Sequence, residues 1–256
     1  MRIFFITLMI VITQAAFAES DPVACDYQVI QAIHILKLDD SATRLQLFWK
    51  DQNFINYGGI EKLKGELKQN GSELLFAMNS GIYTKNNEPN GLHIENGKKL
   101  MNLYRFDGEN KTRLWNDNFS TNPGLFYISK SNEAYIRSLV TKDGDNKYNH
   151  AYPSDSEIAD YSLAVQSGPV LIKDRVTVGN FKDIRYNRAA VCVYSNKQIG
   201  LFYSNAASIN CLAQALLAEG CKDALYMDGA IVQAFDQGNH FGNQSNTIVG
   251  ILGVVK

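Results

Sequence analysis

The spacing of apolar and polar residues along the chain predicts many short strands and few helices. Apolar alternation with β-branched residues predicts strands over Tyr27–Leu38 and Thr43–Trp49, and the turn-forming sequence Asp39-Asp40-Ser41 lies between them. Similar patterns predict strands over Leu74–Met78, Leu125–Ile128, Glu133–Ser138, Leu163–Gln166, Val170–Ile172, Ala189–Tyr194, Ile199–Tyr203, Ala224–Met227 and Ile231–Phe235.

Two segments have helical periodicity instead. Ile60, Leu63 and Leu67 follow the i, i+3, i+7 spacing, and Gly71 stands just past the expected helix end. Ser208–Ala218 shows the same periodicity and is also followed closely by a glycine. We therefore expect one helix in each segment.

A hairpin is expected around Asn96-Gly97, the strongest short hairpin signal, with strands over Gly91–Glu95 and Lys98–Leu100. His93 alternates with apolar neighbours in the first of these strands. Its side chain is therefore expected to point away from the core.

The C-terminal segment Ile248–Val255 is almost wholly apolar and is predicted to be a buried central strand, because an exposed edge of that composition would aggregate. Thr141–Asp160 is polar and lacks periodicity, which predicts a long surface excursion. The chain shows no repeat and no clear linker. We expect one α+β domain over residues 19–256, with mixed, strand-rich sheets and a few packed helices.

The N-terminus has the pattern of a cleaved signal peptide over residues 1–18. Arg2 is followed by an apolar run, Ile3–Ile12, and Ala16-Phe17-Ala18 supplies the small-residue cleavage pattern. The apolar run is too short to span a bilayer comfortably. The expected location is periplasmic or secreted, with no integral membrane segment after signal cleavage.

Composition narrows the range of partners. The 256 residues carry 25 basic and 26 acidic side chains, and no basic stripe appears. This balance argues against nucleic acid or an anionic membrane as a partner. It leaves the oligomeric state open.

The four cysteines are expected to form disulfides outside the cytoplasm. Cys211 and Cys221 flank a predicted helix, which would place their Cα atoms about 15 Å apart. A disulfide needs roughly 4.4–6.8 Å, so two of the three possible pairings remain open. The sequence has no CxxC and no paired histidine spacing, so we expect no metal and no cofactor.

Four segments combine polar side chains with the ends of apolar strands, and three of them contain glycine. They are Asn79-Ser80-Gly81, Gln166-Ser167-Gly168, Asn187-Arg188 and Asp228-Gly229. Strand ends present reactive groups on a rigid scaffold, and glycine lets a ligand approach the backbone closely. The recurrence of this arrangement indicates one composite site.

The same segments resemble the phosphodiester glycosidases, relatives of the lysosomal "uncovering" enzyme that removes N-acetylglucosamine from a sugar-phosphate diester. Within that family, the chain particularly resembles the bacterial exported branch. The similarity runs from about Leu74 to the C-terminus. The segments that carry it are AMNSGIY, PNGLHIENGK, NFSTNPGLFYI, AVQSGPVLI, NRAAVCV and GCKDALYMDG.

The resemblance implies a single pocket surrounded by Asn79, Gln166, Arg188 and Asp228. Its walls would be shaped by three glycines: Gly81, Gly168 and Gly229. Arg188 would hold the phosphate through its planar fork, and Asp228 would be the catalytic carboxylate. Asn79 and Gln166 would hydrogen-bond sugar hydroxyls.

The expected function is therefore that of an exported hydrolase of glycosyl phosphodiesters. The phosphate leaving group of such a substrate is already a good anion, so one cation and one carboxylate are sufficient for the reaction. The main alternative is a non-catalytic protein that binds an envelope glycan or glycan phosphate. A third reading makes Arg188 and Asp228 a structural ion pair.

Overall fold

The computed structural model describes residue 25 and residues 30–37, 44–105, 122–142, 148–179, 181 and 183–256. The expected signal peptide lies outside these residues, as do residues 27–29 and 38 of the first expected strand, residue 43 of the second and the expected turn between them. No helix among the described residues is long and apolar enough to cross a membrane.

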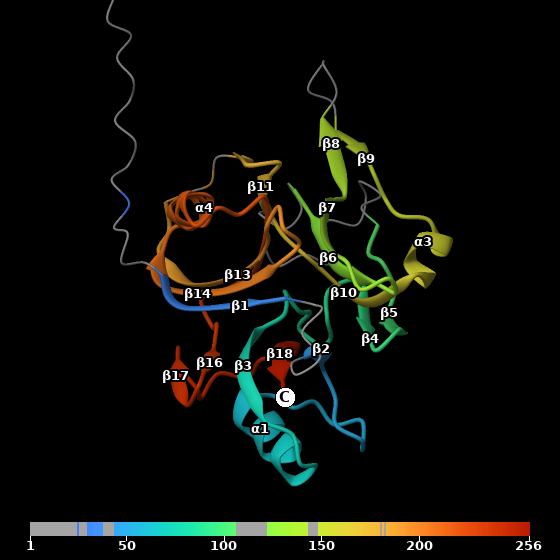
Figure 1. The fold of residues 1–256 in the computed structure, drawn as a ribbon, viewed down its shortest axis with the longest axis vertical. Helices are drawn as coiled ribbons and strands as arrows, with labels where there is room; N and C mark the ends of the chain where they lie inside the picture. The colour runs from blue at the N-terminus through green and yellow to red at the C-terminus, as the bar shows by residue number, and fades with distance from the viewer. Residues whose placement is uncertain are drawn as a thin grey trace, which may run out of the picture.

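Three antiparallel sheets form most of the described chain (Figure 1). The six-stranded sheet has the order β1 (Ile30–Leu36), β14 (Ile199–Ala207), β13 (Tyr186–Val193), β15 (Asp223–Gly229), β11 (Val170–Lys173) and β12 (Val176–Thr177). One five-stranded sheet has the order β5 (Lys98–Met101), β4 (His93–Glu95), β10 (Tyr161–Ser167), β6 (Gly124–Ser129) and β7 (Ala134–Ser138). The other has the order β17 (Asn239–Phe241), β16 (Ala234–Asp236), β3 (Leu74–Asn79), β18 (Ile251–Val255) and β2 (Arg44–Phe48).

Three helices accompany the sheets in the described part of the chain: α1 (Ile60–Gln69), α3 (Asp155–Ala159) and α4 (Ile209–Ala218). Leu212 of α4 packs into a buried cluster with Phe202 of the six-stranded sheet. Leu63 of α1 packs with Ala77 of β3. Figure 1 shows α4 beside the six-stranded sheet at the upper left and α1 at the bottom, beside the sheet that contains β3.

One hydrophobic core joins the three sheets. Its buried members include Phe76 of β3, Phe126 of β6 and Leu201 of β14. Because each large sheet contributes to this cluster, the chain folds as a single strand-rich α+β domain, as expected.

Several local expectations are confirmed. The helices α1 and α4 begin and end close to the predicted positions, and Gly71 beyond α1 has a φ of +77°. Asn96 and Gly97 join β4 and β5 with φ values of +48° and +75°. Positive φ at both positions is the geometry that a type I′ hairpin turn requires.

Two strand predictions needed correction at their N-terminal ends. The C-terminal strand lies between β3 and β2, inside its sheet as expected, but it begins at Ile251 and not at Ile248. The strand predicted from Ile231 begins at Ala234, because the Ile231 N–H donates to the carbonyl of Gly229 in a tight turn.

The polar segment 141–160 contains more secondary structure than expected. The strands β8 (Val140–Lys142) and β9 (Tyr148–His150) form a separate two-stranded pair. Helix α3 follows, and Ser154 and Glu157 close its N-terminus in a reciprocal capping box. Periodicity misses such short elements, because a strand of three residues carries almost no pattern.

The prediction for His93 was wrong, because its side chain is fully buried. The ring packs edge-on against Trp49 at 5.9 Å between centroids, and Nε2 lies 2.8 Å from Oε1 of Glu95. Trp49, which follows β2, covers the face of β4 that alternation had assigned to solvent. Both faces of this strand are therefore covered.

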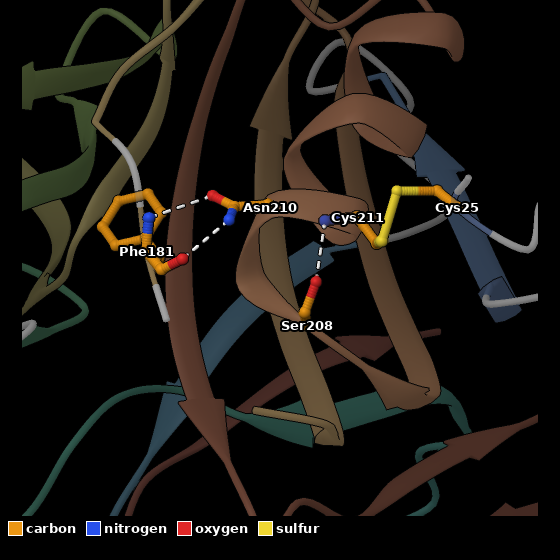
Figure 2. The surroundings of a disulfide bond; sticks show 5 residues. All are labelled: Cys25, Phe181, Ser208, Asn210 and Cys211. Atoms are coloured by element: carbon orange, nitrogen blue, oxygen red, sulfur yellow. Dashed lines mark hydrogen bonds between the residues drawn. A yellow bond between two sulfur atoms is a disulfide. The ribbon is translucent and has the colours of Figure 1, made fainter. Parts of the chain in front are cut away.

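Two disulfides form, and both belong to one of the pairings that remained open. Cys192 pairs with Cys221, and Cys25 pairs with Cys211. Figure 2 shows the second bond at the first turn of α4, where the Ser208 hydroxyl accepts the N–H of Cys211. This bond attaches residue 25 to the helix.

Removal of the internal disulfide tests its share of the stability. Cys192 and Cys221 are both fully buried, and the bond closes a loop with a sequence separation of 29 residues. Loop-closure entropy predicts a loss of about 3–4 kcal/mol in the free energy of unfolding for Cys192→Ala/Cys221→Ala, measured by denaturant titration. A loss below about 1 kcal/mol would contradict this expectation.

Candidate active site

A cavity of about 640 Å³ opens where three parts of the chain meet. Its lining comes from residues 82–87 after β3, from residues 184–188 at the start of β13 and from residues 226–231 at the end of β15. Ile209 at the start of α4 completes one side. Arg188 and Asp228 both line this cavity.

The pairing of β13 with β15 places these two charged residues side by side. Arg188 is the register partner of Gly229, and Ala189 is the partner of Asp228. The register shifts between Ala189 and Ala190, which marks a β-bulge next to the charged pair. Bulges of this kind re-aim side chains at the end of a strand.

Asp228 is a buried carboxyl group held by two donors. Its Oδ2 accepts from Nδ2 of Asn79 at 2.6 Å, and its Oδ1 accepts from the N–H of Gly229 at 2.7 Å. Burial raises the pKa of Asp228 to about 7, although both hydrogen bonds and the charge of Arg188 act in the opposite direction. The carboxyl group therefore titrates near neutral pH.

Arg188 is buried and is oriented by three protein acceptors. Nε donates to the carbonyl of Ala207 at 3.0 Å, Nη1 to the hydroxyl of Tyr226 at 2.6 Å, and Nη2 to the carbonyl of Ile184 at 2.6 Å. A guanidinium has five N–H donors, so one N–H on each Nη is left over from these bonds. The ion pairs between described residues do not include one from Arg188 to Asp228.

Tyr226 helps to orient Arg188 through a hydrogen bond. Tyr226 precedes Asp228 by two positions in β15, and both residues line the cavity. Burial raises the pKa of Tyr226 to about 12, so its hydroxyl stays protonated at neutral pH and accepts from Nη1 of Arg188. Its ring is almost fully buried.

Asn79 lies behind Asp228 and is not part of the cavity lining. Its Oδ1 accepts the N–H of Gln233 at 2.9 Å while its Nδ2 donates to Asp228. The side-chain amide is thus used on both ends by the protein. The structure brings Asn79 to the carboxyl group that a ligand would meet.

Gln166 is also outside this lining. Its Oε1 accepts from the N–H of Leu92 at 3.1 Å and from the N–H of Tyr104 at 2.9 Å, and its Nε2 donates to the carbonyl of Tyr104. The side chain therefore joins two loop segments next to the five-stranded sheet that contains β10.

The three glycines occupy different places. Gly229 lines the cavity, and a Cβ there would collide with the hydroxyl of Tyr226 and approach Nη1 of Arg188 to 2.8 Å. Gly81 faces the Val165 side chain, which a Cβ would meet at 3.1 Å. Gly168 precedes Pro169 through a cis peptide bond. Of the three, Gly229 alone is placed to shape the cavity wall.

Residues 82–87 were missed by the sequence analysis. Tyr83 and Lys85 line the cavity, and burial raises the pKa of Tyr83, with the charge of Asp228 adding to the effect. These residues follow Asn79-Ser80-Gly81 directly, so continuing along the chain from that motif could have found them.

The described residues contain no group of three or more His, Cys, Asp or Glu side chains that could hold a metal ion.

A family model described as phosphodiester glycosidase matches residues 72–254. Among curated proteins, the uncharacterized protein YigE of Escherichia coli K12 is 28% identical over 224 residues, which cover 82% of this chain and 77% of YigE. The region that the family model matches, residues 72–254, contains all the candidate site residues named above.

Three solved structures share the fold. The zebrafish N-acetylglucosamine-1-phosphodiester alpha-N-acetylglucosaminidase catalytic domain is 13% identical with a TM-score of 0.50, over 87% of each chain. A presumed exported protein of Burkholderia pseudomallei is 10% identical with a TM-score of 0.57, over 87% of this chain and 73% of that one. A hypothetical protein of Synechocystis is 14% identical with a TM-score of 0.52, and the match covers 87% of this chain but 58% of that one.

Replacing Asn79 tests its position between Asp228 and Gln233. Asn79→Ala removes one donor from Asp228 and leaves the buried N–H of Gln233 without its acceptor. We expect a loss of about 1–3 kcal/mol in the free energy of unfolding. We also expect the pKa of Asp228 to rise further above its ordinary value, as measured by NMR titration of the carboxyl carbon.

Asn239→Ala is the matched control, because Asn239 is exposed in β17. Its unfolding free energy is expected to change by less than about 0.5 kcal/mol. If the two variants had equal free energies of unfolding, the hydrogen bonds of Asn79 would not contribute to stability.

Proposed function

Because the chain belongs to the phosphodiester glycosidase family, we propose that it hydrolyses glycosyl phosphodiesters at the bond between the anomeric carbon and the phosphate oxygen. The observation that carries the proposal is the shared cavity of Arg188 and Asp228. A buried carboxyl group whose pKa is about 7 stands beside a buried guanidinium with N–H donors to spare.

In the proposed reaction, ionised Asp228 accepts a proton from water as the water oxygen attacks the anomeric carbon. The bond from that carbon to the bridging oxygen breaks, and its electron pair leaves with the phosphate monoester. The products are a free sugar and the phosphate monoester of the second alcohol. A phosphate leaving group needs little protonation, so one carboxylate is sufficient.

Arg188 is proposed to hold the phosphate. The three bonds to Ala207, Ile184 and Tyr226 fix the guanidinium plane before the substrate arrives. A preorganised cation stabilises the charge that builds up on the leaving phosphate without having to reorganise. Gly229 leaves room for this arrangement because it has no side chain.

Asn79 is proposed to act through Asp228. Its amide donates to Oδ2 and so supports the ionised form against the effect of burial. We propose this positioning role for Asn79 in place of contact with sugar hydroxyls, because both ends of its amide bond to the protein. The amide of Gln166 likewise bonds to Leu92 and Tyr104.

Two disulfide bonds favour a location outside the cytoplasm, and a structural neighbour described as a presumed exported protein agrees with it. We propose that the protein is periplasmic or secreted. Suitable substrates in that compartment are sugar-phosphate decorations of envelope polymers and nucleotide-sugar-like diesters.

Hydrolysis of a panel of sugar-1-phosphate diesters by residues 19–256 tests the proposal. We expect the wild type to release free sugar and Asp228→Asn to lower kcat at least about 100-fold, because the amide cannot accept the water proton. Asp155→Asn, in the exposed first turn of α3, is the control and should retain full activity.

Arg188→Lys is expected to lower kcat/KM about 100-fold, because an ammonium group cannot reproduce the bidentate fork. Exposed Arg185 supplies the control, Arg185→Lys. No turnover by the wild type, combined with stabilisation by sugar phosphates in a melting assay, would instead identify a glycan-phosphate binding protein.

The pH dependence follows from the raised pKa of Asp228. The ionised form is the active one, so kcat/KM is expected to rise with pH up to about 7 and then to level off. Below that value it should fall about tenfold per pH unit. A profile without an ionisation between roughly pH 6 and 8 would contradict the assignment of Asp228 as the base.

A further inference from the structure

Two backbone carbonyls orient Arg188 in addition to the hydroxyl of Tyr226. The carbonyl of Ala207 lies at the end of β14, directly before α4, and the carbonyl of Ile184 lies in the loop before β13. Both are neutral groups, so they orient the guanidinium without cancelling its positive charge. The direction in which Arg188 presents its remaining N–H groups therefore depends on how firmly these two carbonyls are held.

The two carbonyls differ in how they are held. Ala207 is buried and is the register partner of Tyr186 where β13 pairs with β14. Ile184 is exposed, as are both of its neighbours, so water can compete for its carbonyl. The geometry of the bond from Nη2 of Arg188 to Ile184 therefore depends on how the loop before β13 is anchored.

Asn210 anchors that loop to the first turn of α4 (Figure 2). The N–H of Phe181 donates to Oδ1 of Asn210 at 3.0 Å, and Nδ2 of Asn210 donates to the carbonyl of Phe181 at 2.7 Å. One amide thus engages both backbone groups of a residue that precedes Ile184 by three positions. The ring of Phe181 packs against the buried cluster that contains Leu212 of α4. The ring therefore fixes the location of this residue, and the amide fixes the orientation of its backbone.

The same turn of α4 reaches the site in two other ways. Ser208, the N-cap of the helix, directly follows Ala207, and Ile209 lines the candidate active-site cavity. The turn thus stands next to one acceptor of Arg188, forms part of the cavity wall, and reaches the second acceptor through Asn210.

We propose that Asn210 is a positioning residue for Arg188, acting through the backbone of Phe181 and the carbonyl of Ile184. The consequence for phosphate rests on the proposed function, whereas the orientation of the guanidinium does not. Without the amide of Asn210, the loop before β13 would lose its attachment to α4, and Arg188 would lose a fixed acceptor. A small misplacement of a group that contacts the substrate is costly in catalysis, so the effect should be visible in turnover.

Nitrogen-15 NMR of the Arg188 side chain tests the contact chain without any substrate. Rotation about the bond between Nε and Cζ exchanges Nη1 with Nη2, so it must break the bonds to Tyr226 and Ile184. Asn210→Ala is expected to speed this rotation at least about tenfold, because the bond to Ile184 is weakened. Equal rotation rates in Asn210→Ala and the wild type would overturn the proposal.

Gln214→Ala is the matched control for this measurement. Gln214 is an exposed amide one turn further along α4, and its replacement should leave the rotation of Arg188 unchanged. An equal effect of Gln214→Ala would show that any change in α4 loosens Arg188, and it would overturn the specific role of Asn210.

Kinetics on the diester that the substrate panel identifies test the consequence for phosphate. Asn210→Ala should lower kcat/KM about tenfold, and Asn210→Asp should do the same, because a carboxylate cannot donate to the Phe181 carbonyl. In the Arg188→Lys background, Asn210→Ala should cause no further loss, because residues that act through one another are not additive. The same loss in both backgrounds would overturn the proposal.

The two measurements separate this proposal from the proposed function. If the wild type turned over no diester while Arg188 rotated faster in Asn210→Ala but not in Gln214→Ala, the hydrolase would be overturned and the positioning of Arg188 would stand. If turnover was lost in Asp228→Asn but neither Asn210 variant changed it, the hydrolase would stand and the role of Asn210 would be overturned.

Discussion

The hydrogen bond from Asn79 to Asp228 joins the ends of two strands that belong to different sheets. A buried carboxyl group is costly unless donors reach it, and the end of β3 supplies one of the two donors. Because Oδ1 of Asn79 also accepts the N–H of Gln233, the loop between β15 and β16 is fastened at the same place. The packing of the two sheets therefore sets the protonation of Asp228.

Arg188 depends on a different chain of contacts, which begins at a disulfide. Cys25 is bonded to Cys211 in the first turn of α4, whose N-terminus is capped by Ser208 (Figure 2). The carbonyl just before that cap, on Ala207, accepts from Nε of Arg188. The Cys25–Cys211 disulfide thus supports the helix next to the carbonyl that orients the Arg188 guanidinium.

Residues 82–90 form a short hairpin, and the residues from Ile82 to Lys85 line the candidate active-site cavity. The internal hydrogen bonds of this hairpin and the bond from Asn56 to Asn87 hold it in place. Gln166 accepts hydrogen bonds from the backbone N–H groups of Leu92 and Tyr104 and so joins two loop segments, although it belongs to a segment whose sequence resembles a ligand-binding motif. A residue of a recognisable motif can therefore lie outside the cavity that Arg188 and Asp228 line and can bond to other parts of the protein instead.

The sequence by itself determined the strand-rich class, both long helices and the hairpin at Asn96-Gly97, because these depend on local periodicity, turn chemistry and residue type, which are visible over a few neighbouring positions. A common pocket for Arg188 and Asp228 was expected from the resemblance to the phosphodiester glycosidases, and the structure places both residues in the lining of one cavity. Only the tertiary structure decided that His93 is buried, that Asn79 and Gln166 bond to the protein, and that residues 82–87 line the cavity. Trp49 covers His93 and Tyr104 engages Gln166 across long sequence separations, and no local pattern records which distant side chain will arrive at a given face.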